Sequence, residues 1–228
     1  MIPSIVQSTA GVTLLGGVGA PVSDVAEALT IAPCLVAADG GADHALAQGR
    51  MPEAVIGDFD SLSAGARARI PPARLHRIAE QDSTDFGKCL MHVAAPFFLA
   101  LGFLGGRVDH TLSVLSGLTS FPERKVVLIG PEDVAFLAPP ELRLDLAPGT
   151  RVSLYPMGPV SGVSEGLHWP IAGLSLAPAG RIGTSNRAEG PVCLRLMGPC
   201  IVLVPRDALG AVLAGLGIAG FPAEGGGV

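Results

Sequence analysis

The sequence has few charged and few aromatic side chains. Of its 228 residues, 15% are charged and 4% are aromatic, and the formal net charge is −5. Proteins that bind nucleic acid through its phosphates carry clusters of Lys and Arg, and this chain has no such cluster. We therefore expect no nucleic-acid partner.

The chain also lacks the marks of secretion and of a membrane anchor. No Lys or Arg precedes Arg50, whereas a secretory signal begins with a positively charged segment. The longest uncharged apolar run, Val93–Gly106, contains Pro96 and Gly102, and it is shorter than the roughly 20 residues that cross a bilayer. The four cysteines form no CxxC pair. We expect a cytoplasmic protein with reduced thiols and no membrane contact.

Hydrophobic residues are abundant, at 49%, and up to residue 138 short apolar runs alternate with helical patterns. Strands that alternate with helices favour a mostly parallel sheet covered by helices on both faces. The runs that predict strands are Val12–Leu15, Cys34–Ala38, Ala54–Ile56, Leu75–Ile78, Phe97–Leu101, Val126–Ile129 and Val134–Leu137.

The pattern changes after Pro139-Pro140. The later apolar runs are short, are separated by Gly and Pro, and lack helical spacing, which is typical of an all-β sandwich or barrel. We therefore predict an α/β domain over residues 1–138 and an all-β domain over residues 139–228, with a disordered tail at Ala223–Val228. The predicted strands of the second domain are Arg143–Leu146, Arg151–Tyr155, Gly173–Leu176, Val192–Leu196 and Ile201–Val204.

Polar clusters follow the strands of the first domain, where ligands bind in open α/β sheets. Asp58 and Asp60 are two residues apart at a strand end, so an extended backbone points both carboxylates the same way. Two hard oxygen ligands suit Mg²⁺, although Asp and Ser in such a string also suit a simple turn.

The next two clusters each open a predicted helix. Asp85 and Lys88 are three residues apart and share a helix face, where they suit either a phosphate and metal site or a helix cap with a solvated ion pair. Gly105-Gly106-Arg107 lets the backbone approach a ligand and presents a guanidinium suited to phosphate. His110, which follows Asp109, either orients its neighbours or transfers protons.

Taken together, these residues predict a Mg²⁺–nucleotide phosphotransfer site. The chain has no G-x-x-x-x-G-K-[ST] loop, which excludes the P-loop arrangement, and it has no protein-kinase signature. A dinucleotide-dependent dehydrogenase is disfavoured because no G-x-G-x-x-G follows the first strand.

At these residues the sequence resembles the thiamine pyrophosphokinase family. Six strings occur in the family's order and extend the resemblance over nearly the whole chain. They are Asp39-Gly40-Gly41, Gly57-Asp58-Phe59-Asp60-Ser61, Asp82-Ser83-Thr84-Asp85-Phe86 with Lys88, Gly106-Arg107-Val108-Asp109-His110, Gly166-Leu167-His168-Trp169-Pro170-Ile171, and Thr184-Ser185-Asn186.

The resemblance implies a Rossmann-like α/β nucleotide domain, a C-terminal β-sandwich, and a homodimer with thiamine bound between protomers. Its implied reaction moves a diphosphate group from ATP to the thiamine hydroxyl, giving thiamine diphosphate and AMP. The implied Mg²⁺ ligands are Asp58, Asp60 and Asp85, and the implied catalytic set adds Lys88 and Arg107. The implied ATP contacts are Asp39, Gly40, Gly41, Lys88, Arg107, Asp109 and His110. The implied thiamine contacts are Gln81, Trp169, Ser185 and Asn186.

The single Trp fits this assignment, since Trp169 lies between Gly and Pro residues rather than in an obvious strand. An aromatic face beside a cationic or flat ring is favourable by roughly 0.5–2 kcal/mol. Two other functions remain open. One is a related pyrophosphokinase that acts on a hydroxymethyl-pterin, and the other is a non-catalytic thiamine- or nucleotide-binding protein.

Overall fold

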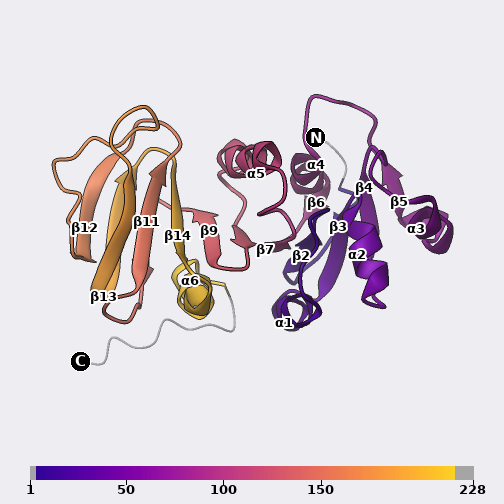
Figure 1. Cartoon of the computed structure of the whole chain (residues 1–228), viewed down its shortest axis with the longest axis horizontal. Coiled ribbons are helices and arrows are strands. Elements are labelled where there is room, and N and C mark those ends of the chain that lie inside the picture. Colours follow the sequence, from indigo (N-terminus) through magenta and orange to yellow (C-terminus); the bar gives the residue numbers. More distant parts are fainter. Residues whose placement is uncertain (1–3, 219–228) are drawn as a thin grey trace. The chain divides into compact units, whose positions relative to one another are not determined.

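The computed structural model describes residues 4–218, so the tail Ala223–Val228 lies outside the described residues. The chain divides into two compact units, within Met1–Gly130 and Pro131–Val228 (Figure 1). Each unit is described separately.

The first unit is built on short parallel strands. β2 (Val12–Leu15) pairs with β7 (Phe98–Leu101), which pairs with β8 (Val126–Ile129). β3 (Cys34–Ala38), β4 (Ala54–Gly57) and β5 (Leu75–Arg77) form a second parallel set, and β3 lies beside β2. Every residue of β2, β4, β7 and β8 is buried, which explains why these strands are continuous apolar runs.

Helices cover the strands of this unit. α1 and α2 contact β2, α2 also contacts β3, and α4 contacts β3 and β4. The helices are α1 (Val22–Ile31), α2 (Gly41–Ala47), α3 (Ala64–Arg69), α4 (Asp85–His92) and α5 (Val108–Ser120), with a 3-10 turn at Pro72–Arg74. α3 was not predicted.

α4 is short because the chain becomes extended again directly after it. Thr84 caps the start of α4, where its Oγ1 accepts the N–H of Gly87 at 3.1 Å. At the other end, the helix passes directly into β6 (Val93–Ala94), which pairs with β1 (Val6–Gln7). The apolar run Val93–Gly106 is thus divided between β6 and β7. No helix within residues 4–218 combines the length and the apolar character that a bilayer crossing requires.

The second unit consists of antiparallel strands and one short helix. β14 lies between β9 and β11, and the long strand β13 pairs with β11 through its first residues and with β10 and β12 through its later ones. The elements are β9 (Asp133–Leu137), β10 (Glu141–Leu144), β11 (Arg151–Pro156), β12 (Ser161–Leu167), β13 (Gly183–Met197), β14 (Cys200–Pro205), a 3-10 turn at Arg206–Ala208, and α6 (Leu209–Gly215).

The second unit differs from the sequence prediction in several places, and one of them is α6, since an all-β domain was predicted. β9, predicted to close the parallel series, pairs antiparallel with β14, so the second unit begins at Pro131 rather than at residue 139. β12 was not predicted, because its sequence is rich in Gly, Ser and Glu and most of its residues are only partly buried. The predicted strand Gly173–Leu176 makes only isolated bridges, at Leu176.

Candidate active site

Three acidic residues gather where two neighbouring strands end. Asp39 directly follows β3, and Asp58 and Asp60 follow β4, which pairs with β3 in parallel. One carboxylate oxygen from each of the three lies within 4.8 Å of the others. Carboxylates that converge at this spacing can share a hard divalent cation such as Mg²⁺.

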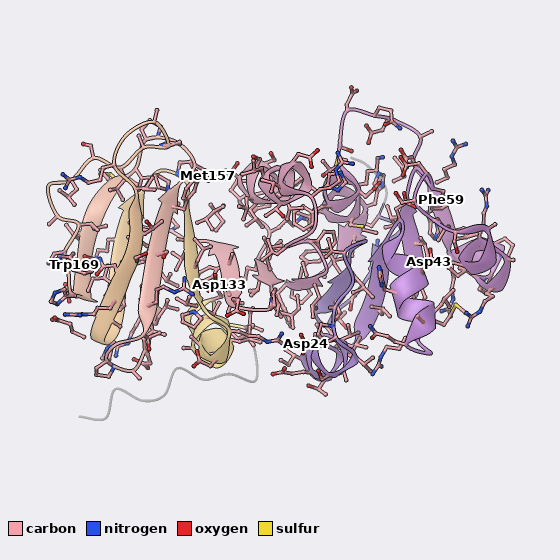
Figure 2. All side chains as sticks on the ribbon, in the orientation of Figure 1. Asp24, Asp43, Phe59, Asp133, Met157 and Trp169 are labelled. Atoms are coloured by element: carbon pink, nitrogen blue, oxygen red, sulfur yellow. The ribbon has the colours of Figure 1, made fainter. Side chains whose placement is uncertain are left out.

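The backbone at these strand ends is shaped to bring the side chains together. Asp39 (φ 42°) and Phe59 (φ 69°) both adopt the left-handed conformation, which is uncommon for residues other than glycine and marks a constrained turn. Figure 2 marks Phe59 beyond the end of β4. At Gly57, a Cβ would lie 2.8 Å from the Cβ of Asp39 and 3.1 Å from Oδ1 of Asp85. A glycine is therefore needed where these two acidic residues approach β4.

Asp39 is buried, with only 2% of the residue exposed, and its Oδ1 has no hydrogen-bond partner among the described residues. Its Oδ2 accepts the N–H of Ser61 at 3.2 Å, and Gly40 lies against the same loop. Burial raises the pKa of Asp39 to about 6, the Ser61 N–H opposes this rise, and the carboxylates of Asp85 and Asp60 add to it. A cation would stabilise a buried carboxylate oxygen that has no donor, so these residues fit a divalent metal.

Two side chains form hydrogen bonds to Asp58. Arg77 is the last residue of β5, and Gln81 follows it in the next loop. Nε of Arg77 donates to the backbone carbonyl of Asp58 at 3.0 Å, and Nε2 of Gln81 donates to Oδ2 of Asp58 at 2.8 Å. The Gln81 amide, followed by the N–H of Asp60, lowers the pKa of Asp58. Gln81, predicted as a contact to a substrate ring, here orients an acidic residue. Arg77 was not predicted, and its only sequence signal is its place at a strand end.

Asp85 and Lys88 lie together in the first turns of α4. Lys88 is 2% exposed, and its Nζ lies 3.5 Å from Oδ1 of Asp85. Burial raises the pKa of Asp85, whereas the charge of Lys88 lowers it. A buried ammonium beside a partly buried carboxylate gives this edge of the sheet a positive charge next to the three acidic residues.

The ends of the other strands meet at the same edge. A Cβ at Gly41, just after Asp39, would overlap the carbonyl oxygen of Leu15 at the end of β2. A Cβ at Gly102, just after β7, would lie 2.7 Å from the carbonyl oxygen of Gly16. These glycines allow close backbone approach, so the ends of β7, β2, β3 and β4 are adjacent.

The remaining predicted residues of the first unit lie at the start of α5. Nε and Nη2 of Arg107 donate to the two carboxylate oxygens of Asp109 at 3.1 and 2.5 Å, and the N–H of His110 donates to Oδ1 of Asp109 at 3.0 Å. The hydrogen bonds from Arg107 lower the pKa of Asp109 to about 2. Both side chains are exposed, so an anionic ligand would compete with Asp109 for the guanidinium.

The predicted residues of the second unit lie together around one loop. Trp169, which Figure 2 marks beside β12, is 56% exposed. The N–H of Trp169 donates to Oδ1 of Asn186 at 3.1 Å, and Nδ2 of Asn186 donates to the carbonyl of Trp169 at 2.7 Å. Ser185 adopts a left-handed conformation (φ 61°), and its N–H donates to Oγ of Ser153 at 3.0 Å. An exposed indole on a fixed backbone can stack on a flat ring.

Comparison with known proteins identifies similar sequences. Residues 25–129 match the family model for "Thiamin pyrophosphokinase, catalytic domain". A curated relative from rice, "Thiamine pyrophosphokinase 1", is 28% identical over an alignment that covers 60% of this chain and 60% of the relative. The chain thus spans about 60% of that relative's length.

Solved structures share the fold over a larger part of the chain. The thiamin pyrophosphokinase from Candida albicans superposes with a TM-score of 0.76 at 18% identity, covering 90% of this chain and 94% of that chain. The yeast thiamin pyrophosphokinase gives a TM-score of 0.74 at 18% identity, covering 92% and 94%. At these identities the likeness shows the fold, a mixed sheet with helices.

Proposed function

We propose that this chain, whose residues 25–129 match the catalytic-domain model of the thiamin pyrophosphokinase family, transfers a diphosphate group from ATP to the hydroxyl of thiamine. The products are thiamine diphosphate and AMP. The thiamine oxygen forms a bond to the β-phosphorus, the bond from that phosphorus to the oxygen bridging to the α-phosphorus breaks, and AMP leaves.

The observation that carries this proposal is the group of three carboxylates at the ends of β3 and β4. Asp39, Asp58 and Asp60 each offer an oxygen to a common point, and one oxygen of Asp39 is buried with no donor among the described residues. Such a set would hold Mg²⁺, which when bound neutralises charge on the phosphates. From sequence we expected Asp85 as the third ligand. Asp39 is better supported as the third ligand. Asp85 lies beside the three carboxylates and forms an ion pair with Lys88.

The other residues would bind and orient the substrates. Lys88 and Arg107 would neutralise phosphate charge, Gly40, Gly41 and His110 would line the nucleotide site, and Asp109 would hold Arg107 until phosphate replaces it. In-line transfer depends mostly on positioning and charge. Asp85 is our candidate to accept the hydroxyl proton, because burial raises its pKa and makes it a stronger base.

We assign thiamine binding to the second unit, with Trp169 stacked on a substrate ring and Ser185 and Asn186 beside it. The same proposal includes a Rossmann-like first unit and a β-sandwich second unit. It also includes a homodimer with thiamine between protomers. The parallel set β3-β4-β5 and the antiparallel strands from β9 to β14 support the two descriptions.

Product analysis with purified protein, ATP, Mg²⁺ and thiamine tests the reaction. We expect AMP and thiamine diphosphate in equal amounts, and none of either when a chelator is present or thiamine is omitted. ADP with thiamine monophosphate would mean a simple kinase. Turnover with a hydroxymethyl-pterin in place of thiamine would change the acceptor, and thiamine binding without turnover would mean a binding protein.

Asp58→Asn tests the role of the carboxylates. Loss of one ligand charge should lower turnover by about 100-fold while the melting temperature changes little, because Asp58 is only partly buried. Asp207→Asn, an exposed acidic residue of the second unit, is the matched control and should retain full activity. If Asp58→Asn unfolds the protein instead, Asp58 is structural.

A further inference from the structure

Three side chains with no role so far form a bonded group beside the indole of Trp169. The His168 ring meets it edge to face, with centroids 4.6 Å apart and an interplanar angle of 80°. The guanidinium carbon of Arg187 lies over the indole, 5.7 Å from its centroid. Glu189 does not touch the indole but bonds His168, with Oε1 2.6 Å from Nδ1.

These side chains also bond one another. Nη2 of Arg187 lies 3.2 and 3.1 Å from the two ring nitrogens of His168, and the backbone N–H of His168 donates to the carbonyl of Arg187 at 3.0 Å. His168 is therefore held between a carboxylate and a guanidinium, and both arginine and imidazole contact the indole.

Strand alternation explains why these residues meet here. Arg187 and Glu189 are two residues apart on β13, so both side chains leave the same, exposed face. The intervening Ala188 is buried and pairs with Leu167 at the end of β12. His168 and Trp169 follow Leu167 immediately, so the register of β12 on β13 brings all four side chains together.

The Asn186 hydrogen bonds fix the backbone of Trp169 but leave its two side-chain torsions free. We propose that His168, Arg187 and Glu189 are positioning residues that set the orientation of the Trp169 indole. Arg187 lies over the ring and His168 packs against it at a steep angle, while more than half of the Trp169 surface stays exposed and is available to the flat ring of the acceptor. The acceptor's identity as thiamine rests on the function proposed above, whereas the positioning of the indole does not.

A ring held in its binding orientation loses less conformational freedom when it stacks on a ligand, so the acceptor binds more tightly. Arg187 contributes both a charge over the ring and a bond to His168. Lysine would keep the charge but lose the planar fork. The indole anisotropy and the KM for thiamine of Arg187→Lys should therefore lie between those of the wild type and of Arg187→Ala.

Fluorescence gives a direct test, because Trp169 is the only tryptophan in the chain. The variants are His168→Ala, Glu189→Gln, Arg187→Ala and Arg187→Lys, with Arg195→Ala, an exposed arginine on the same strand, as the matched control. Steady-state anisotropy of the protein without substrate measures the mobility of the indole. Quenching by thiamine measures its Kd, and steady-state kinetics separates KM from kcat.

We expect lower anisotropy in His168→Ala and Arg187→Ala, with the KM for thiamine raised roughly two- to fivefold per lost contact and kcat nearly unchanged. Arg195→Ala should match the wild type. Anisotropy equal to that of the wild type in every variant would overturn the proposal. If the wild type neither binds nor turns over thiamine, the proposed function fails, and the anisotropy series alone then decides the positioning role.

Discussion

The acidic residues of the first unit and the Trp169 loop of the second present their side chains by different means. Asp39 and Asp58 directly follow buried strands, so their positions depend on the packed sheet beneath them. Trp169 follows β12, a strand of partly exposed residues, and its backbone is fixed by the single side chain of Asn186.

This difference suits the two kinds of chemistry that we propose. Charge neutralisation at phosphate depends on a cation whose carboxylate ligands are held within a few tenths of an ångström. Buried strand ends can supply ligands at that precision. Stacking on a flat ring tolerates more freedom, and local hydrogen bonds suffice for it. We therefore expect substitutions in the first region to lower turnover and substitutions in the second to weaken acceptor binding.

Gly57→Ala should have the largest effect. Its Cβ would lie 2.8 Å from the Cβ of Asp39, closer than packed atoms allow, so the ends of β3 and β4 must move apart. Because small displacements of catalytic groups are costly, we expect kcat to fall by about 100-fold or more.

Gly65→Ala is the control for this substitution. Gly65 is an exposed residue of α3 with room for a Cβ, and alanine there should leave activity unchanged and raise stability by roughly 0.5–1 kcal/mol. Wild-type turnover in Gly57→Ala would mean that the close approach of Asp39 and Asp85 to β4 does not matter for function.

Asp39→Asn should separate activity from stability. Asparagine removes a buried charge that has no donor to one of its oxygens, so the metal-free variant should melt at a higher temperature than the wild type at pH 7. The variant should also need roughly 10- to 100-fold more Mg²⁺ for turnover. Mg²⁺ should raise the melting temperature of the wild type, but not that of the variant.

The pH dependence of this stability difference has a defined sign. Asp39 has a pKa of about 6 in the folded protein, against about 3.9 for an unfolded chain. Between these values the folded state binds the extra proton, so this contribution to stability is present at low pH and is lost as pH rises from about 4 to about 6. The melting temperature of Asp39→Asn should therefore exceed that of the wild type by more at pH 7 than at pH 4.

Much of the first unit follows from its sequence. Its buried strands are continuous apolar runs that end in acidic or Gly-rich strings, so both the strands and the edge that collects the acidic residues could be predicted. α3 escaped prediction because it is short, and its Ala-Gly-Ala-Arg sequence shows little apolar spacing. The orphan oxygen of Asp39 could not be predicted either, since its burial depends on how Gly57 and Ser61 pack around it.

The second unit was harder to predict because its pairing is set by tertiary structure. Val134–Leu137 looks like any buried strand, and only its antiparallel partner β14 assigns it to this unit. β13 extends over 15 residues because different parts of it pair with β11, β10 and β12. The bonds that join His168 to Arg187 and Glu189 follow from that register, so no role for His168 could be predicted from its sequence context.

Asn186→Ala should have the smallest effect on turnover and a specific effect on acceptor binding. Alanine leaves the N–H and the carbonyl of Trp169 without their partner, which should cost about 1–3 kcal/mol of stability. The loop then loses its fixed position, and we expect the KM for thiamine to rise about tenfold while kcat and the KM for ATP stay close to wild type.

Thr13→Val is the matched control, because it removes a buried hydrogen bond to the carbonyl of Ala32 in the first unit. It should lower stability by a similar amount without changing the KM for thiamine, which separates general destabilisation from loss of the Trp169 loop. If Asn186→Ala lowers kcat as strongly as Gly57→Ala does, the second region also positions the reacting groups. The division between a catalytic edge and a binding loop would then be wrong.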